Sequence, residues 1–123
     1  MRILLLDDNV DILESMRLLL ATGGYDAVTS DDARAALELQ RRQPADLLIT
    51  DIFMPGTDGL ETIVAFRSGW PRLKIIAISG GGVRARRDYL GVASEIGADI
   101  VMRKPVDPEE LLTTVQRLAN GHG

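Results

Sequence analysis

Several kinds of chemistry are excluded by what this chain of 123 residues lacks. It contains no cysteine, so it has no disulfide scaffold, no thiol nucleophile and no thiolate metal site. Its single histidine, His122, is the second residue from the end, which argues against a histidine-based triad or a histidine-rich metal site. The longest uninterrupted apolar runs have four residues, as at 3–6 and 75–78, and runs this short fit neither a transmembrane helix nor a secretory signal.

Positive charge is also in the minority. Fourteen basic residues stand against eighteen acidic ones, and the formal net charge of −4 disfavours binding to a phosphate backbone. The composition, 46% hydrophobic and 26% charged, is that of an ordinary globular protein. The length allows one domain, which we expect at residues 1–120, followed by a frayed tail at 121–123. We therefore expect a soluble, cytoplasmic domain that binds neither nucleic acid directly nor a membrane.

Short apolar runs alternate with longer amphipathic stretches five times along the chain. The apolar runs predict strands over 3–6, 25–29, 46–50, 74–79 and 100–102. The amphipathic stretches predict helices over 10–22, from Ser30 or Asp31 to about 42, over 60–68, over 86–96 and from Asp107-Pro108 onward. The turn signals Pro55-Gly56 and Asp58-Gly59 separate the third strand from its helix.

This alternation predicts an α/β fold: a doubly wound, five-stranded parallel sheet with five helices on both faces. The first, third and fourth runs are continuously apolar, which is typical of central parallel strands. The second and fifth runs carry more polar residues, which is typical of edge strands. Together these patterns predict the flavodoxin-like strand order 2-1-3-4-5.

Polar residues follow the apolar runs at the points where the predicted strands end. They are Asp7 and Asp8 after the first strand, Asp51 after the third, Ser79 after the fourth and Lys104 after the fifth. Ligands of doubly wound sheets bind at the carboxyl ends of the strands, so we expect the three carboxylates to converge in one crevice. Their mutual repulsion favours a shared cation, and an all-oxygen site suits Mg²⁺ and a substrate phosphate.

Each of these residues alone has an ordinary structural explanation. An aspartate after a strand is commonly a helix cap or a turn former. Ser79, just before three glycines, would be a loop residue, and Lys104 would be a solvated charge. The combination at successive strand ends instead indicates a phosphoryl-transfer site with a metal, a cation, a hydroxyl donor and a nucleophilic carboxylate.

The chain resembles the receiver domains of two-component response regulators over essentially its full length. Five separated segments carry the resemblance in the family's order: Leu5-Leu6-Asp7-Asp8-Asn9, Ile49-Thr50-Asp51-Ile52-Phe53-Met54-Pro55-Gly56-Thr57-Asp58-Gly59, Ile76-Ala77-Ile78-Ser79-Gly80, Gly97-Ala98-Asp99 and Arg103-Lys104-Pro105.

The resemblance implies that Asp51 is phosphorylated by a phosphohistidine of a sensor kinase or of a histidine phosphotransfer protein. It implies Mg²⁺ held directly by Asp8 and Asp51, through water by Asp7, and by the backbone carbonyl of Phe53. It further implies no enzyme activity beyond self-catalysed phosphoryl transfer and slow autodephosphorylation.

The resemblance also implies that Ser79 and Lys104 bind phosphoryl oxygens and that the bond before Pro105 is cis, which aims Lys104 into the site. The extra charge and acceptor oxygens of a phosphorylated Asp51 would draw Ser79 and the loop after it inward. That loop and the following helix are the expected switch, acting on an unknown output protein.

Two departures from the family pattern bear on this switch. Val101 stands where the family usually has an aromatic residue, so signal output is expected to run through the loop alone. The separation of 25 positions between Ser79 and Lys104 is about three longer than the family pattern, and the extra length is assigned to residues 80–87. Their arginines, Arg84, Arg86 and Arg87, form either a solvated helix start or a docking patch for an acidic partner.

A third feature is Phe53, two residues after the acceptor. Its ring either shields the phosphoryl group from water or simply packs against the loop. In the first case the phosphorylated state is expected to be long-lived.

Two other functions compete with a phosphorylated receiver. Residues 80–85 match the dinucleotide fingerprint G-x-G-x-x-A, but they follow the fourth strand and the remaining chain is short for a nucleotide-binding half. A degenerate receiver that docks without phosphorylation is the other alternative, against which the intact site residues argue. The sequence ends just after the last predicted helix, so we expect either a stand-alone receiver or one excised from a longer regulator.

Overall fold

A computed structural model describes residues 1–54, 57–80 and 91–121. Its five-stranded sheet is parallel throughout and has the order β2-β1-β3-β6-β7, which confirms the predicted order. The strands are β1 (Arg2–Leu6), β2 (Asp26–Ser30), β3 (Leu47–Asp51), β6 (Lys74–Ser79) and β7 (Ile100–Arg103). The helices are α1 (Val10–Thr22), α2 (Ala33–Arg42), α3 (Gly59–Gly69) and α5 (Pro108–Ala119), and residues 91–96 are also helical.

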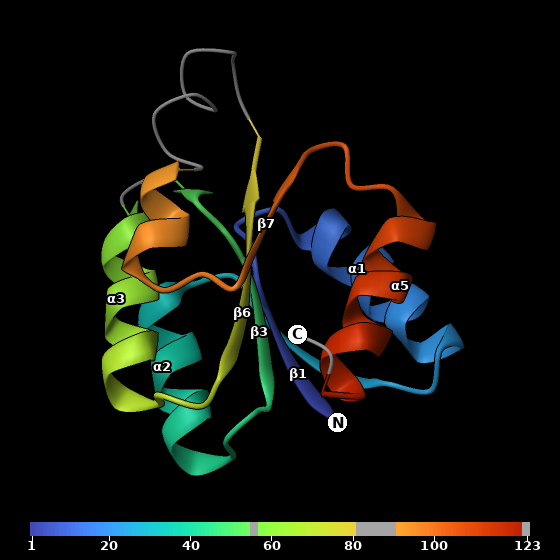
Figure 1. Cartoon of the computed structure of the whole chain (residues 1–123), viewed down its shortest axis with the longest axis horizontal. Coiled ribbons are helices and arrows are strands. Elements are labelled where there is room, and N and C mark those ends of the chain that lie inside the picture. Colours follow the sequence, from blue (N-terminus) through green and yellow to red (C-terminus); the bar gives the residue numbers. More distant parts are fainter. Residues whose placement is uncertain (55–56, 81–90, 122–123) are drawn as a thin grey trace.

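The helices cover both faces of the sheet, as predicted. α2, α3 and the helical residues 91–96 lie on one face, and α1 and α5 lie on the other (Figure 1). Ala36 and Ile63 belong to an apolar cluster on the first face, and Leu20 and Leu111 belong to a second cluster on the opposite face. β3 is buried along its whole length because both faces are covered, which accounts for its continuous apolar run.

The helix starts follow from capping residues. The Asn9 side chain accepts hydrogen bonds from the first turn of α1, and that helix has the predicted bounds. The prediction of Ser30 or Asp31 as the cap of α2 is wrong: Asp32 caps it, accepting from the N–H of Ala35 at 2.9 Å. Ser30 instead completes β2, because the ladder with β1 continues to that residue.

A short antiparallel pair, β4 (Phe53–Met54) with β5 (Thr57–Asp58), follows β3 and was not predicted. The predicted turn at 55–56 lies outside the described residues. Asp58 caps α3, which begins at Gly59, one residue earlier than predicted. Gly59 packs against the backbone of Ile52, where any side chain would collide with the carbonyl.

The predicted helix over 86–96 is described only for its last part, 91–96. It ends before Gly97, whose φ of +134° is a conformation that favours glycine. Residues 81–90 lie outside the described structure, and with them all but Gly80 of the triple-glycine loop and of the dinucleotide-type motif, and the three arginines of the expected docking patch.

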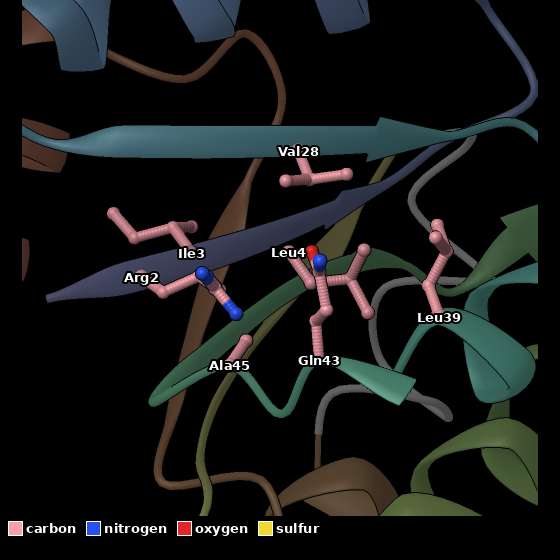
Figure 2. A pocket seen from close by; sticks show the side chains of 7 residues that line it. All are labelled: Arg2, Ile3, Leu4, Val28, Leu39, Gln43 and Ala45. Carbon is pink, nitrogen blue, oxygen red and sulfur yellow. The ribbon is translucent and has the colours of Figure 1, made fainter. Parts of the chain in front are cut away.

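The interior is closely packed between α2 and the sheet edge formed by β1 and β2. Figure 2 shows the cavity there, which has a volume of about 10 Å³. Its walls include Ile3, Val28 and Leu39. A space this small holds at most one water molecule and no ligand. Among the described helices, none is both long and apolar enough to cross a membrane.

Candidate functional site

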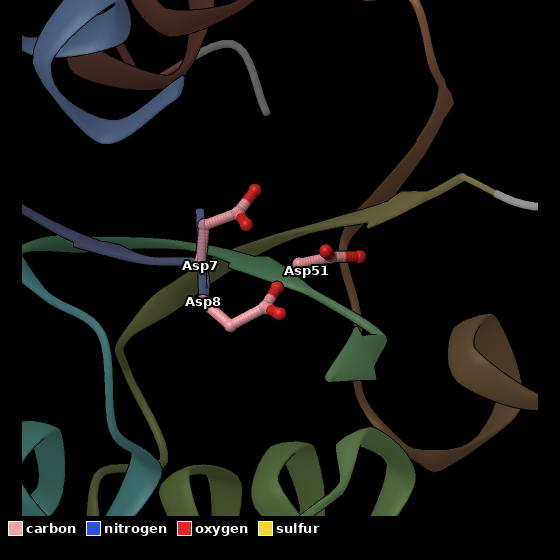
Figure 3. A group of neighbouring side chains, drawn as sticks. All are labelled: Asp7, Asp8 and Asp51. Carbon is pink, nitrogen blue, oxygen red and sulfur yellow. The ribbon is translucent and has the colours of Figure 1, made fainter. Parts of the chain in front are cut away.

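Three carboxylates meet at the carboxyl ends of β1 and β3. Asp7 and Asp8 directly follow β1, and Asp51 is the last residue of β3. The register that pairs Leu6 with Thr50 brings these strand ends side by side. One carboxylate oxygen from each aspartate lies within 4.8 Å of the others. Figure 3 shows the three side chains, which come from neighbouring strand ends. Asp7 and Asp51 are buried and Asp8 is exposed, so the cluster opens to solvent on one side.

Lys104 joins the two buried carboxylates from the end of β7. Its Nζ donates to Oδ2 of Asp7 at 3.1 Å and to Oδ2 of Asp51 at 3.0 Å. The N–H of Lys104 donates to the carbonyl of Ser79 at 2.9 Å, and the Lys104–Pro105 peptide bond is cis. The structure therefore places the predicted lysine among the predicted acids.

Backbone N–H groups orient the same two carboxylates. Oδ1 of Asp7 accepts from the N–H of Asn9 at 2.9 Å, and Oδ1 of Asp51 accepts from the N–H of Phe53 at 3.1 Å. Each buried carboxylate thus has one oxygen held by the backbone and the other held by the Lys104 ammonium. In the described part of the chain, the Asp8 carboxylate has no hydrogen bond or ion pair, so it is available to a ligand.

The environment of the cluster raises the pKa values of both Asp51 and Lys104. Burial raises the pKa of Asp51 above its usual range, and the negative Asp7 adds to the rise, while Lys104 and the Phe53 N–H oppose it. Burial acts to lower the pKa of Lys104, but its hydrogen bonds and charge interactions with Asp51 and Asp7 outweigh burial, so this pKa is raised. The lysine therefore stays charged, whereas ionised Asp51 has a free-energy cost.

Ser79 ends β6 next to this cluster and is fully buried. Its hydroxyl donates to the carbonyl of Gly80 at 3.2 Å. A Cβ on Gly80 would lie 3.0 Å from Cδ of Lys104, so the glycine lets the lysine stem pass close to the backbone. This role of Gly80 was not predicted from the sequence, although its position directly after Ser79 was a usable signal.

Phe53 and Val101 both pack against the apolar cluster on the α2–α3 face, and both are partly buried. For Phe53 this contact agrees with the packing interpretation, and the shielding of a phosphoryl group stays a prediction. For Val101 it shows an aliphatic side chain filling the place where the family usually has an aromatic ring.

The donor set fits a hard divalent cation. All three clustered side chains offer carboxylate oxygens, and Mg²⁺ prefers oxygen ligands while keeping several waters. Three carboxylates and one ammonium leave an excess of negative charge that such a cation would offset. The arrangement thus combines an acid cluster that could hold a metal ion, a fixed ammonium and a buried carboxylate, which are the kinds of group that phosphoryl transfer uses.

The chain matches the model of the response regulator receiver domain over residues 3–116. It is 36% identical to the response regulator MprA of Mycobacterium leprae (strain TN) over 118 residues, which is 96% of this chain and 50% of that protein. It is 32% identical to an uncharacterized 14.6 kDa protein of Leptolyngbya boryana, with 95% and 88% covered. The chain spans about half the length of the MprA relatives that it matches.

Solved structures agree with this relationship. A response regulator receiver domain protein from Clostridium thermocellum matches with a TM-score of 0.88 at 26% identity, covering 97% of this chain and 94% of its own. The chemotaxis protein CheY4 of Vibrio cholerae matches with a TM-score of 0.82 at 29% identity, covering 94% and 96%. The chain belongs to the receiver domain family of two-component response regulators.

Proposed function

We propose that Asp51 accepts a phosphoryl group from a phosphohistidine of a sensor kinase or a histidine phosphotransfer protein. The observation that carries this proposal is the contact of the Lys104 ammonium with both Asp7 and Asp51 inside the acid cluster. A carboxylate oxygen of Asp51 forms the new O–P bond as the P–N bond breaks, and the electron pair of that bond returns to the imidazole. Ionised Asp51 is needed for the attack, and Lys104 favours that ionised form.

Asp8 and Asp51, the backbone carbonyl of Phe53 and, through water, Asp7 would hold Mg²⁺ in this reaction. When bound, the ion would offset charge on the transferring phosphoryl oxygens. Exposed Asp8 supports this assignment, because its carboxylate is open to an incoming ligand while Asp7 and Asp51 are already oriented by the backbone.

Lys104 and Ser79 would bind the oxygens of the transferred group. Lys104 already lies 3.0 Å from Oδ2 of Asp51, so it needs little movement to meet a phosphoryl oxygen. The Ser79 hydroxyl would exchange the Gly80 carbonyl for a phosphoryl oxygen, and this exchange would displace the backbone that follows. The change would then alter contacts with an output protein.

The same proposal assigns the receiver domain to residues 1–120 and places its action in the cytoplasm, where it would meet the kinase. Its chemistry is a single self-catalysed transfer with slow hydrolysis, which differs from the turnover of a separate substrate.

Acetyl phosphate with Mg²⁺ tests the proposal directly. We expect a mass gain of one phosphoryl group in the parent protein and none in Asp51→Ala. Asp26→Asn, which changes an exposed carboxylate on β2, is the matched control and should still be labelled. If the parent gains no mass with either acetyl phosphate or a phosphorylated kinase domain, the chain is a degenerate docking module.

A further inference from the structure

A concave surface lies at the amino ends of β1, β3 and β6, opposite the carboxyl ends that carry the acid cluster. This edge groove has a volume of about 490 Å³, within the range of ligand sites in proteins. It is lined by Met1, Ala45, Asp46, Gly69, Trp70, Pro71, Arg72, Leu73, Lys74 and Leu118. We propose that the edge groove binds an acidic segment of a partner protein that carries a large apolar side chain.

The centre of the edge groove is apolar. Leu73 and Leu118 are buried, and Trp70 is only partly buried. The Trp70 ring packs on Phe66 in a tilted arrangement with centroids 5.8 Å apart, which leaves it contributing to the groove wall. A partly exposed tryptophan beside leucines is the kind of surface that anchors an apolar side chain of a partner.

The wall of the edge groove is held in place by Arg67. Its Nη1 donates to the carbonyls of Pro71 at 2.9 Å and Leu73 at 2.6 Å. Its Nε and Nη2 donate to the carbonyl of Gly97 at 3.2 and 2.6 Å, and Nη2 also donates to Oδ2 of Asp99 at 2.9 Å. The groove is therefore formed before any partner arrives, which lowers the entropy cost of binding.

The charges around the edge groove select an acidic partner. Arg72 is exposed and Lys74 is partly exposed, and in the described part of the chain neither makes an ion pair. The single acid in the lining, Asp46, accepts at Oδ2 from the N–H of Arg2 at 2.9 Å. This local excess of positive charge occurs in a chain whose formal net charge is −4. The positive charge of Arg72 and Lys74 would attract an acidic segment to the edge groove.

The edge groove is separate from the phosphoryl site. Lys74 and Ser79 are the first and last residues of β6, so the two sites lie roughly 17 Å apart at 3.3 Å per residue. Both can be occupied at once, and the partner proposed here does not depend on the phosphorylation of Asp51.

Trp70 is the only tryptophan in the chain, so its emission reports on the edge groove alone. The probe is a blocked hexapeptide, Glu-Glu-Leu-Asp-Phe-Glu, titrated without Mg²⁺ or acetyl phosphate. We expect a shift in Trp70 emission and a calorimetric isotherm that both weaken with added salt. The neutral counterpart, Gln-Gln-Leu-Asn-Phe-Gln, should bind about fivefold more weakly, which corresponds to about 1 kcal/mol from the rim charges.

Two charge reversals locate the binding surface. Arg72→Glu, in the turn before β6, should weaken the acidic peptide about fivefold or more. Arg34→Glu makes the same charge change at an exposed position on α2, where Arg34 has no ion pair with any described residue, and should leave the affinity unchanged. Equal binding of the neutral peptide, equal weakening by both variants, no calorimetric binding, or binding only to anionic lipid vesicles would each overturn the proposal. So would self-association of the chain that buries Trp70 in place of the peptide.

Discussion

Gly59 lies so close to the carbonyl of Ile52 that a Cβ on Gly59 would be 2.1 Å from its oxygen. This contact fixes the start of α3 against the segment that follows Asp51. We predict that Gly59→Ala lowers the free energy of unfolding by about 3 kcal/mol, because the backbone must move to admit the methyl group. Urea denaturation measures the change.

Gly69→Ala is the matched control, since a Cβ at Gly69 would contact nothing within 4 Å. Alanine is the better helix former, so this variant should be neutral or up to about 1 kcal/mol more stable. Equal destabilisation by the two substitutions would contradict the assignment of a close approach at Gly59.

Ionised Asp51 should reduce the stability of the metal-free protein. Its folded-state pKa is raised by burial, so between the unfolded-state and folded-state pKa values the folded protein binds more protons than the unfolded chain. Stability should therefore fall as the pH rises from about 3.9 through the folded-state pKa. Asp51→Asn should remove this fall and raise the stability and the Tm at neutral pH. Thermal melts across this pH range would refute the assignment if parent and variant had parallel curves.

Lys104 should stabilise the two buried carboxylates in the absence of metal. Lys104→Gln leaves Asp7 and Asp51 without their cation, and we expect a loss of about 2 kcal/mol that Mg²⁺ largely restores. Mg²⁺ should also bind the variant more tightly, because no ammonium competes for the carboxylates. Denaturation with and without Mg²⁺ gives both quantities.

Lys74→Gln, which changes the chain's only other lysine, is the control. It should change neither the gain in stability on adding Mg²⁺ nor the affinity for Mg²⁺. A Lys104→Gln protein as stable as the parent without metal would show that the ammonium does not compensate the buried charges.

Arg67 should stabilise the fold because its side chain joins α3 to the turn before β6 and to the segment before β7. Arg67→Ala removes five hydrogen bonds to Pro71, Leu73, Gly97 and Asp99, and we predict a loss of about 3 kcal/mol in chemical denaturation. Arg67→Lys should recover only part of this loss, because an ammonium cannot reproduce the planar fork of donors.

Arg17→Ala on the exposed face of α1 is the comparison. It breaks a surface ion pair with Glu14 and should cost no more than about 0.5 kcal/mol. Full recovery of stability by Arg67→Lys would mean that charge alone, without the fork geometry, holds these segments together.

Phe53 should set the lifetime of the phosphorylated state if its ring shields the phosphoryl group. Phe53→Asn is then expected to lose its label several-fold faster after Mg²⁺ and acetyl phosphate are removed, as followed by intact mass. Val64→Asn, at an exposed apolar position on α3, should decay like the parent. Decay of Phe53→Asn no faster than the parent would leave only the packing role.

Most of the fold followed from local patterns because the central strands are buried on both faces. The strand order depended on which runs were continuously apolar, and β3 and β6 have the burial that this pattern implies. The errors occurred where a polar residue could serve two purposes. Ser30 is a common cap residue, but in this chain its pairing with Leu6 extends β2 and moves the cap of α2 to Asp32.

The residues of the candidate site could be predicted from the sequence, but the hydrogen bonds between them could not. The strand ends alone brought Asp7, Asp51 and Lys104 together. The hydrogen bonds from the backbone at Asn9 and Phe53 depend on loop conformation, which no periodicity encodes. The edge groove was also missed, since it arises from the turn that Arg67 holds, and a single arginine near a helix end is an ordinary sequence feature.

The side chains of the candidate site all come from strand ends, and among the described residues none of them lies in a helix. Asp7, Asp51, Ser79 and Lys104 take their positions from the register of a buried sheet. Because the sheet register fixes these positions, substitutions on the exposed helix faces are expected to leave the geometry of the cluster unchanged. The outer surface of the helices is therefore the part of this chain that can be redesigned without disturbing the acids and the lysine.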